Sequence, residues 1–363
     1  MGGAFLPYIQ DTLLRHNRYP EVDFFVIGEG ETSLYRLIES VEEQKNPIDV
    51  PHLLYAGPDG RYQMTSSQWT EDVNLLPLPD YSALPLGSYF LEPQMMPYLS
   101  SRGCYWNRCS FCSQSCNYGS RYRAREIDRV IEDLTEIKRT YHAKYLYFND
   151  ESLHPKRILE LSRKMIQAGL DFKWLAASRM EEGLTKEHFE LAHRAGLRYV
   201  AFGMESASQN TLDKMRKGTR VESMARVLKE SHEAGIANHI FVITDFPGDL
   251  DIRQTVDFVK HNAGYIDSLA CSFFCLEKHS YIYDHPEEFD IEISIEPDDK
   301  FGLYWPYRHL ENGKPREEKP QFAYIEDYKW VIESFSDFPF NFEEFVRYDD
   351  RRLFVHIATR GKM

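Results

Sequence analysis

Cysteine spacing is the feature of this sequence with the clearest chemical meaning. Four of the six cysteines fall within thirteen residues, at Cys104, Cys109, Cys112 and Cys116. The first three have the spacing C-x4-C-x2-C, which lets three thiolates on one loop converge on a single metal centre. Thiolates are soft ligands that suit iron–sulfur clusters and zinc. A cubane cluster held by three thiolates keeps one iron open, and an open metal position distinguishes a reactive site from a closed structural one.

Structural zinc and disulfides are the alternative interpretations of these cysteines. Zinc modules more often contain two C-x2-C pairs, whereas here only Cys109 and Cys112 form such a pair. Disulfide frameworks are typical of shorter, secreted chains. We therefore predict that Cys104, Cys109 and Cys112 hold a cluster and that Cys116 lies outside it. A zinc-stabilised, non-catalytic interaction protein is the alternative from another class.

Alternating strands and helices must position this loop. The apolar patterns predict six strands, at Met96–Leu99, Tyr145–Phe148, Phe172–Ala176, Arg198–Met204, Ile240–Thr244 and Ser268–Leu276. Between them, helical spacing predicts five helices, at Ile127–Ile137, Ile158–Ile166, Lys186–Ala195, Ser223–Ala234 and Ile252–Val259. Such alternation implies parallel pairing through right-handed crossovers. We therefore expect an α/β fold with a partial (βα)6 TIM-like barrel over residues 95–285. The cysteine loop would follow its first strand, at the carboxyl edge where barrels place active sites.

The flanking segments are less regular. Residues 1–50 contain one clear strand, Asp23–Ile27, then the turn Gly28-Glu29-Gly30 and a helix, with at most a stub before the strand. Residues 51–94 are rich in Pro, Gly and Asp and are expected to be a linker with a small hairpin around Pro58–Gly60. Residues 286–363 are expected to form a C-terminal α+β extension, rich in aromatic residues, part of which covers the substrate site.

Composition limits the classes of partner. The 363-residue chain has a formal net charge of −14, which disfavours nucleic acid as a partner. It lacks a run of about 20 apolar residues, the length that spans a bilayer. Residues 1–10 lack the basic start and apolar run of a signal peptide. We therefore expect a cytoplasmic protein without a membrane partner. No role is assigned to Cys271 and Cys275.

The cysteine loop followed by six βα units resembles the radical S-adenosylmethionine (radical SAM) superfamily. The usual loop in that family is C-x3-C-x-aromatic-C. Phe111 matches the aromatic position, which in the family packs near the adenine. One extra residue between Cys104 and Cys109 departs from the usual spacing and leaves the subfamily open. The resemblance implies a [4Fe–4S] cluster, S-adenosylmethionine and a reductant such as flavodoxin or ferredoxin.

Residues at successive strand ends extend the resemblance. Asp150 lies where the family holds the methionine amino group, and Gly203-Met204-Glu205-Ser206 resembles the G-x-E-S segment that contacts the methionyl and ribose portions. The family also contacts the cofactor at the end of the third strand and at a G-x-P-G turn after the fifth strand. In this sequence Asp245 stands near the position of the first glycine of that turn. The resemblance thus implies cofactor-binding roles for Phe111, Asp150, Ser178, Arg179, Gly203, Glu205, Ser206, Pro247 and Gly248. The alternative for Asp150 and Glu205 is that they are loop carboxylates facing water.

The amino-terminal glycines resemble part of a second domain. Gly28-Glu29-Gly30 is similar to the last βα unit of the cobalamin-binding domain fused to many radical SAM enzymes, and Met1-Gly2-Gly3 resembles the unit before it. We therefore expect a truncated, doubly wound α/β remnant over residues 1–50 that does not retain cobalamin. The implied activity is formation of a 5′-deoxyadenosyl radical, used for cobalamin-dependent methylation of an unactivated carbon in a natural product or peptide. A non-methylating cyclase or rearrangement enzyme is the alternative.

Overall fold

The computed structural model describes residues 1–315, except 3–4, 17–18, 20, 68, 89–94, 120, 249–251 and 295–302. The expectations for residues 316–363, including most of the aromatic extension, lie outside the described residues. Among the described residues, no helix is long and apolar enough to cross a bilayer.

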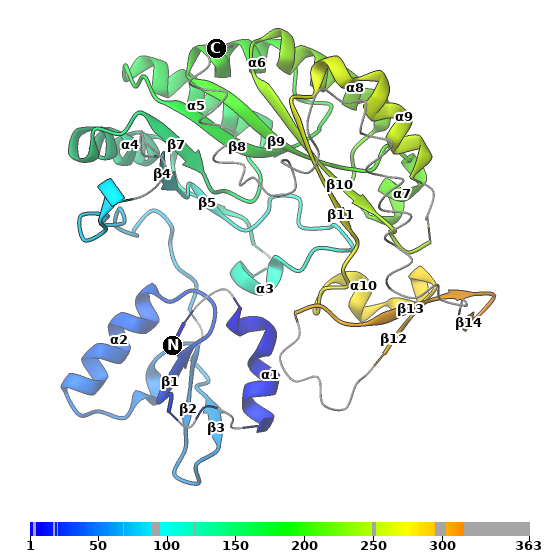
Figure 1. Ribbon diagram of the computed structural model, residues 1–363. Helices are drawn as coiled ribbons and strands as arrows, with labels where there is room; N and C mark the ends of the chain where they lie inside the picture. Colours follow the sequence, from blue (N-terminus) through cyan, green and yellow to red (C-terminus); the bar gives the residue numbers. More distant parts are fainter. Residues whose placement is uncertain are drawn as a thin grey trace.

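A six-stranded parallel sheet forms the centre of the fold (Figure 1). Its strands are β4 (Met95–Tyr98), β7 (Tyr145–Phe148), β8 (Lys173–Arg179), β9 (Leu197–Glu205), β10 (Ala237–Thr244) and β11 (Ser268–Phe273). Neighbouring strands follow the order of the chain, and every pair is parallel. This arrangement is consistent with the expected partial barrel, because each crossover passes through a helix.

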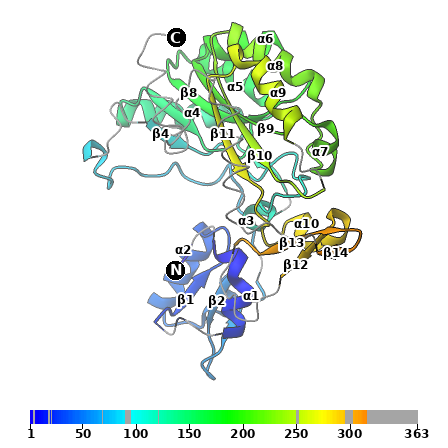
Figure 2. The same ribbon diagram turned by 45° about the vertical axis from the view of Figure 1, so that its right-hand side comes forward.

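Helices connect these strands and cover one face of the sheet (Figures 1 and 2). They are α4 (Ile127–Tyr141), α5 (Pro155–Gln167), α6 (Lys186–Arg194), α7 (Gln209–Lys214), α8 (Val221–Glu233) and α9 (Arg253–His261), with the short 3-10 helix η3 (Ala263–Tyr265) after α9. Successive residues of a strand point to opposite faces of the sheet. Accordingly, Trp174 is buried in the core shared with the helices, whereas its neighbour Leu175 packs with Tyr199 and Ala201 in a separate cluster.

The amino-terminal module, residues 1–73, forms a separate small sheet. It contains α1 (Leu6–His16), β1 (Phe24–Val26), α2 (Glu31–Glu42), the 3-10 helix η1 (Pro47–Asp49), β2 (Leu53–Ala56) and β3 (Tyr62–Met64). The strand order is β1-β2-β3 with antiparallel pairs, and Gly2 forms a parallel bridge to Val26. The hairpin expected around Pro58–Gly60 is present. Because β2 pairs with β1, the first part of the expected linker belongs to this sheet.

Helix α1 lies between β1 and the stub expected before it, where Gly2 bridges to Val26. Leu6, Ile9 and Leu13 recur at helical spacing on α1 and pack against Phe25 and Leu54. The apolar periodicity of this segment was a sufficient signal for a helix. The module therefore holds one parallel βαβ unit closed by an antiparallel hairpin.

Several short elements surround the carboxyl edge of the large sheet. The hairpin of β5 (Ser101–Arg102) and β6 (Arg123–Ala124) flanks the cysteine loop, and α3 (Ser115–Tyr118) follows Cys112. The described part of the C-terminal extension contains α10 (Tyr281–Asp284), η4 (Pro286–Phe289), β12 (Ile291–Ile293), β13 (Tyr307–Glu311) and β14 (Lys314–Pro315). Earlier in the chain, the short 3-10 helix η2 (Leu86–Ser88) precedes β4. An apolar cluster of Met215, Phe246, Phe274, Ile282 and Phe289 joins the extension to the sheet edge.

Candidate active site

The cysteine loop begins at a buried carboxylate. Asp150, just after β7, accepts hydrogen bonds from the backbone N–H of Ser100 (3.1 Å) and the Ser100 hydroxyl (2.8 Å), and also from the Ser101 hydroxyl. Burial raises the pKa of Asp150, and these hydrogen bonds oppose the increase. The carboxylate thus fixes the start of the loop, because a buried acceptor left without donors is costly. Its expected contact with the methionine amino group stays a prediction. Glu151, the next residue, is half-buried at the same edge.

Three thiols lie within electrostatic reach of one another. Burial is the largest cause that raises the pKa of Cys112, to about 12, and the charges of Cys109 and Cys104 raise it further. Cys104 likewise contributes to the raised pKa of Cys109. The pKa of Cys116 is raised first by burial and then by the Asp284 carboxylate. The predicted triad, and the position of Cys116 outside it, stay predictions.

The surroundings of the triad fit an anionic cluster. Burial raises the pKa of Cys109, but the cations of Lys217 and Arg179 act in the opposite direction and favour the thiolate. Metal binding requires deprotonated thiols, so nearby cations help to form the ligand set. The three cysteines are free thiols. The donor set and its charge therefore suit an iron–sulfur cluster.

A buried ion pair stands at the end of β9. Lys217 Nζ donates to Glu205 Oε1 at 2.7 Å, and the two side chains are 8% and 10% exposed. Burial alone would lower the pKa of Lys217, but Glu205 and Cys109 outweigh this effect and raise it. Lys217 also lies 5.8 Å from the centre of the Phe111 ring. The sequence analysis did not single out Lys217, because it is a basic residue in the turn after α7 and belongs to no motif.

Gly203 is required by this ion pair. A Cβ at Gly203 would lie 2.8 Å from both Glu205 Oε1 and Lys217 Nζ. Glu205 itself has a φ of +63°, a conformation that non-glycine residues rarely adopt. The G-x-E pattern at the end of β9 is thus explained by steric contact and backbone geometry. Such strain tends to occur at functional sites.

Arg179 and Trp106 pack together next to Lys217. The Arg179 guanidinium carbon lies 4.3 Å from the centre of the Trp106 ring. Arg179 also donates to the Lys217 carbonyl and, through Nε, to Glu181 at 2.9 Å. Its buried Nη1 has no hydrogen-bond partner among the described residues. A buried donor of this kind suits an acceptor on a bound cofactor.

Comparison with known proteins points to one family. Residues 98–259 match the family model described as the Radical SAM superfamily. Similarity to this family supports an enzyme and implies a [4Fe–4S] cluster and S-adenosylmethionine as cofactors. It disfavours the non-catalytic zinc alternative.

Two curated relatives and one solved structure illustrate the similarity. The chain is 28% identical over 267 residues to an uncharacterized methyltransferase of Pyrococcus horikoshii (72% of this chain, 57% of the relative). It is 29% identical over 247 residues to the anaerobic magnesium-protoporphyrin IX monomethyl ester cyclase of Rubrivivax gelatinosus (65% and 43%). It thus spans about half the length of these relatives. The radical SAM methyltransferase TsrM of Kitasatospora setae, solved with cobalamin and a [4Fe–4S] cluster, shares the fold with a TM-score of 0.68 at 16% identity (86% and 69%).

Two of the expected radical SAM site residues bind the protein backbone. The Ser178 hydroxyl donates to the Leu153 carbonyl at 3.0 Å. The Ser206 hydroxyl accepts from the backbone N–H of Ser208 at 3.0 Å and contacts Thr255. Both serines are buried. These contacts give them roles in shaping the strand ends, and their contacts with the cofactor stay predictions.

The turn after β10 carries the remaining expected residues. Pro247 is buried, and the Gly248 carbonyl accepts a hydrogen bond from Lys214 Nζ. A Cβ at Gly248 would lie 2.6 Å from that amine, and φ is +80°, so glycine is required. Asp245, which stands near the usual family glycine, has a φ of +57°. Asp245 can adopt this left-handed conformation because Asp tolerates it better than most residues.

An open cleft of about 640 Å³ gives access to the cysteine loop. Its lining includes Cys109, Cys112, Trp106, Arg216 and Tyr281. Of the expected site residues, Cys109 and Cys112 line this cleft, whereas the strand-end residues do not.

Gly218→Ala should disrupt the packing of the Trp106 side chain. Gly218 has a φ of +68°, and a Cβ there would lie 2.1 Å from Trp106 Cζ2. We expect a loss of about 2–4 kcal/mol in the free energy of unfolding, from overpacking and backbone strain together. Gly60→Ala is the matched control, because Gly60 has a φ of +76° and nothing within 4 Å of its Cβ position. Urea denaturation compares the two, and equal losses would contradict the proposed steric contact.

Proposed function

We propose that this chain is a radical SAM enzyme that methylates an unactivated carbon of a natural product or peptide, with the participation of cobalamin and a reductant such as flavodoxin or ferredoxin. The observation that carries the proposal is the loop of Cys104, Cys109 and Cys112 beside the buried Glu205–Lys217 pair at the carboxyl edge of a parallel sheet. Methyltransferases among the relatives, and the cobalamin in TsrM, support methyl transfer. The proposal also divides the chain into four parts: residues 1–50, residues 51–94, residues 95–285 and residues 286–363. The first part of 51–94 joins the amino-terminal sheet through β2 and β3.

The bound cofactors would supply the reductive cleavage of S-adenosylmethionine to methionine and a 5′-deoxyadenosyl radical. Cys104, Cys109 and Cys112 would hold the cluster, and Phe111 would lie beside the adenine. Lys217 and Arg179 would balance the negative charge of the cluster and its thiolates. Their burial excludes water and strengthens these interactions.

Other polar groups orient the cofactor. Glu205, which accepts a hydrogen bond from Lys217 at the end of β9, would contact the methionyl and ribose portions. Arg179 Nη1, which has no hydrogen-bond partner among the described residues, would donate to an acceptor on the cofactor. The turn at Pro247 and Gly248 contributes backbone groups at the next strand end.

Anaerobic reconstitution tests the proposal. We expect about four iron and four sulfide per chain, the content of one cubane. With S-adenosylmethionine and dithionite we expect 5′-deoxyadenosine, measured by liquid chromatography and mass spectrometry. Protein without iron, or iron-loaded protein that forms no deoxyadenosine, would contradict the proposal.

A non-methylating cyclase is the second candidate, because one relative is a cyclase. With a substrate, a methyltransferase yields S-adenosylhomocysteine as well as 5′-deoxyadenosine, whereas a cyclase yields deoxyadenosine alone. Gel filtration after mixing with hydroxocobalamin measures whether this chain retains the corrin. Stoichiometric retention would show a corrin site in this chain and support cobalamin-dependent methylation, whereas a protein fraction without corrin absorbance would argue against cobalamin binding by this chain.

A further inference from the structure

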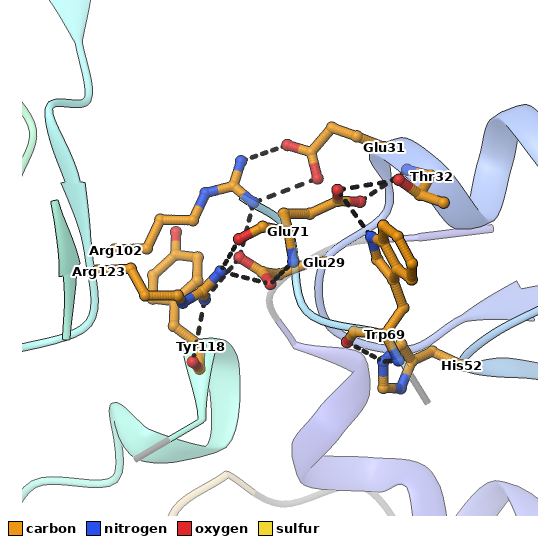
Figure 3. A network of polar contacts seen from close by, with 9 residues as sticks. All are labelled: Glu29, Glu31, Thr32, His52, Trp69, Glu71, Arg102, Tyr118 and Arg123. Carbon is orange, nitrogen blue, oxygen red and sulfur yellow. Dashed lines mark hydrogen bonds and ion pairs between the residues drawn. The ribbon is translucent and has the colours of Figure 1, made fainter. Parts of the chain in front are cut away.

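The amino-terminal module holds the cysteine loop at its beginning. Figure 3 shows the Glu29 carboxylate, from the turn after β1, facing two arginines of the β5–β6 hairpin. Arg102 Nη1 donates to Glu29 Oε1 at 2.7 Å, and the two Arg123 Nη atoms donate at 2.8 and 3.0 Å. The side chains of Glu29, Arg102 and Arg123 are 9%, 11% and 15% exposed. Arg102 also pairs with Glu31.

Glu29 is itself fixed by contacts on its own side. Its Oε2 accepts the backbone N–H of Glu71 at 3.2 Å. The Glu71 carboxylate accepts from the backbone N–H and hydroxyl of Thr32, at the start of α2, and from Trp69 Nε1. The Glu71 carbonyl accepts from Arg123 at 2.7 Å. A network of several side chains that hydrogen-bond to one another holds its geometry more firmly than an isolated ion pair.

A second contact lies at the other end of the triad. The hydroxyls of Tyr8, on α1, and Ser113, directly after Cys112, form a hydrogen bond at 3.1 Å. Ser113 also donates to Glu277 Oε2 at 2.5 Å. Lys278 Nζ donates to the Tyr8 carbonyl at 3.2 Å. The module therefore contacts the segment two residues before the first triad cysteine and the residue after the last.

We propose that Glu29 and Tyr8 are positioning residues for the cluster, which the module holds in place by fixing both ends of its loop. The inference rests on the proposed function, since it requires a cluster on Cys104, Cys109 and Cys112. Its physical basis is that two buried arginines from the two strands of the hairpin repel each other unless Glu29 lies between them.

Glu29→Gln removes the charge and keeps the size of the side chain. We expect a chelator to remove iron from the anaerobically loaded variant about tenfold faster than from the parent chain. In the metal-free chain, hydrogen exchange should accelerate in residues 99–119 and 121–125 while β7 and β9 keep their protection. Glu43→Gln is the control, because its ion pair with Lys45 is exposed on the same module. It should change neither measurement.

Tyr8→Phe tests the second contact with a smaller change. Loss of one hydroxyl should accelerate iron release about threefold, within the range of a single hydrogen bond. The EPR spectrum of the reduced cluster should shift in Glu29→Gln, which a purely global loss of stability would not produce. Iron release and exchange equal to those of the parent chain in both variants would overturn the inference. A parent chain that binds no iron would instead overturn the proposed function, while the exchange experiment would still report on the loop.

Discussion

Replacing any one of Cys104, Cys109 and Cys112 with alanine should leave a protein that binds almost no intact cluster after reconstitution. Each loss removes one of only three thiolate ligands, and two thiolates hold a cubane poorly. We expect iron below about one atom per chain and deoxyadenosine formation reduced by at least about 1,000-fold. Cys116→Ala is the matched control, because Cys116 lies four residues further along and its pKa is affected by Asp284.

Iron and sulfide analysis, with the visible absorbance of the reconstituted variants, gives the measurement. The control should keep the cluster content of the parent chain. Loss of the cluster in Cys116→Ala together with its retention in Cys104→Ala would show that the ligand set is wrong. Circular dichroism of the metal-free variants separates loss of a ligand from loss of the fold.

Lys217→Met should be the most destabilising replacement of a charged side chain at the site. It leaves the Glu205 carboxylate buried without its partner, and breaking a buried pair costs about 3–5 kcal/mol. Lys229→Met is the control, because the Lys229–Glu233 pair is half-exposed with 3.8 Å between its charged atoms. Exposed pairs contribute about 0–1 kcal/mol. Urea denaturation measures both free energies.

The double variant Lys217→Met/Glu205→Gln completes the experiment. Removing the second charge should recover part of the stability, because the uncompensated carboxylate is no longer buried. A loss in Lys217→Met no larger than in the control would show that Glu205 is hydrated. That result would return Glu205 to the alternative of a loop carboxylate facing water.

Local patterns were enough to predict the parallel sheet and the cysteine loop. The period of apolar residues depends on nearest neighbours in sequence, so Tyr145–Phe148 was predicted to its exact ends and the other strands of the sheet to within a few residues. The spacing of Cys104, Cys109 and Cys112 is also local, and thiolate chemistry restricts its meaning. The family resemblance then indicated which strand ends to inspect.

Tertiary structure decided what the polar residues at those ends contact. The local sequence indicates only a tight turn at Glu29, but Glu29 pairs with Arg102 and Arg123, which lie 73 and 94 residues away in the chain. Lys217 carries no motif, yet it pairs with Glu205, and Asp150 proved to be held by serines at the start of the loop. The sequence by itself determined the strands of the large sheet and predicted the ligand loop, because hydrophobic periodicity and metal ligation depend on local spacing. The partners of buried charges depend on which distant segments the fold brings together, and no local pattern records that.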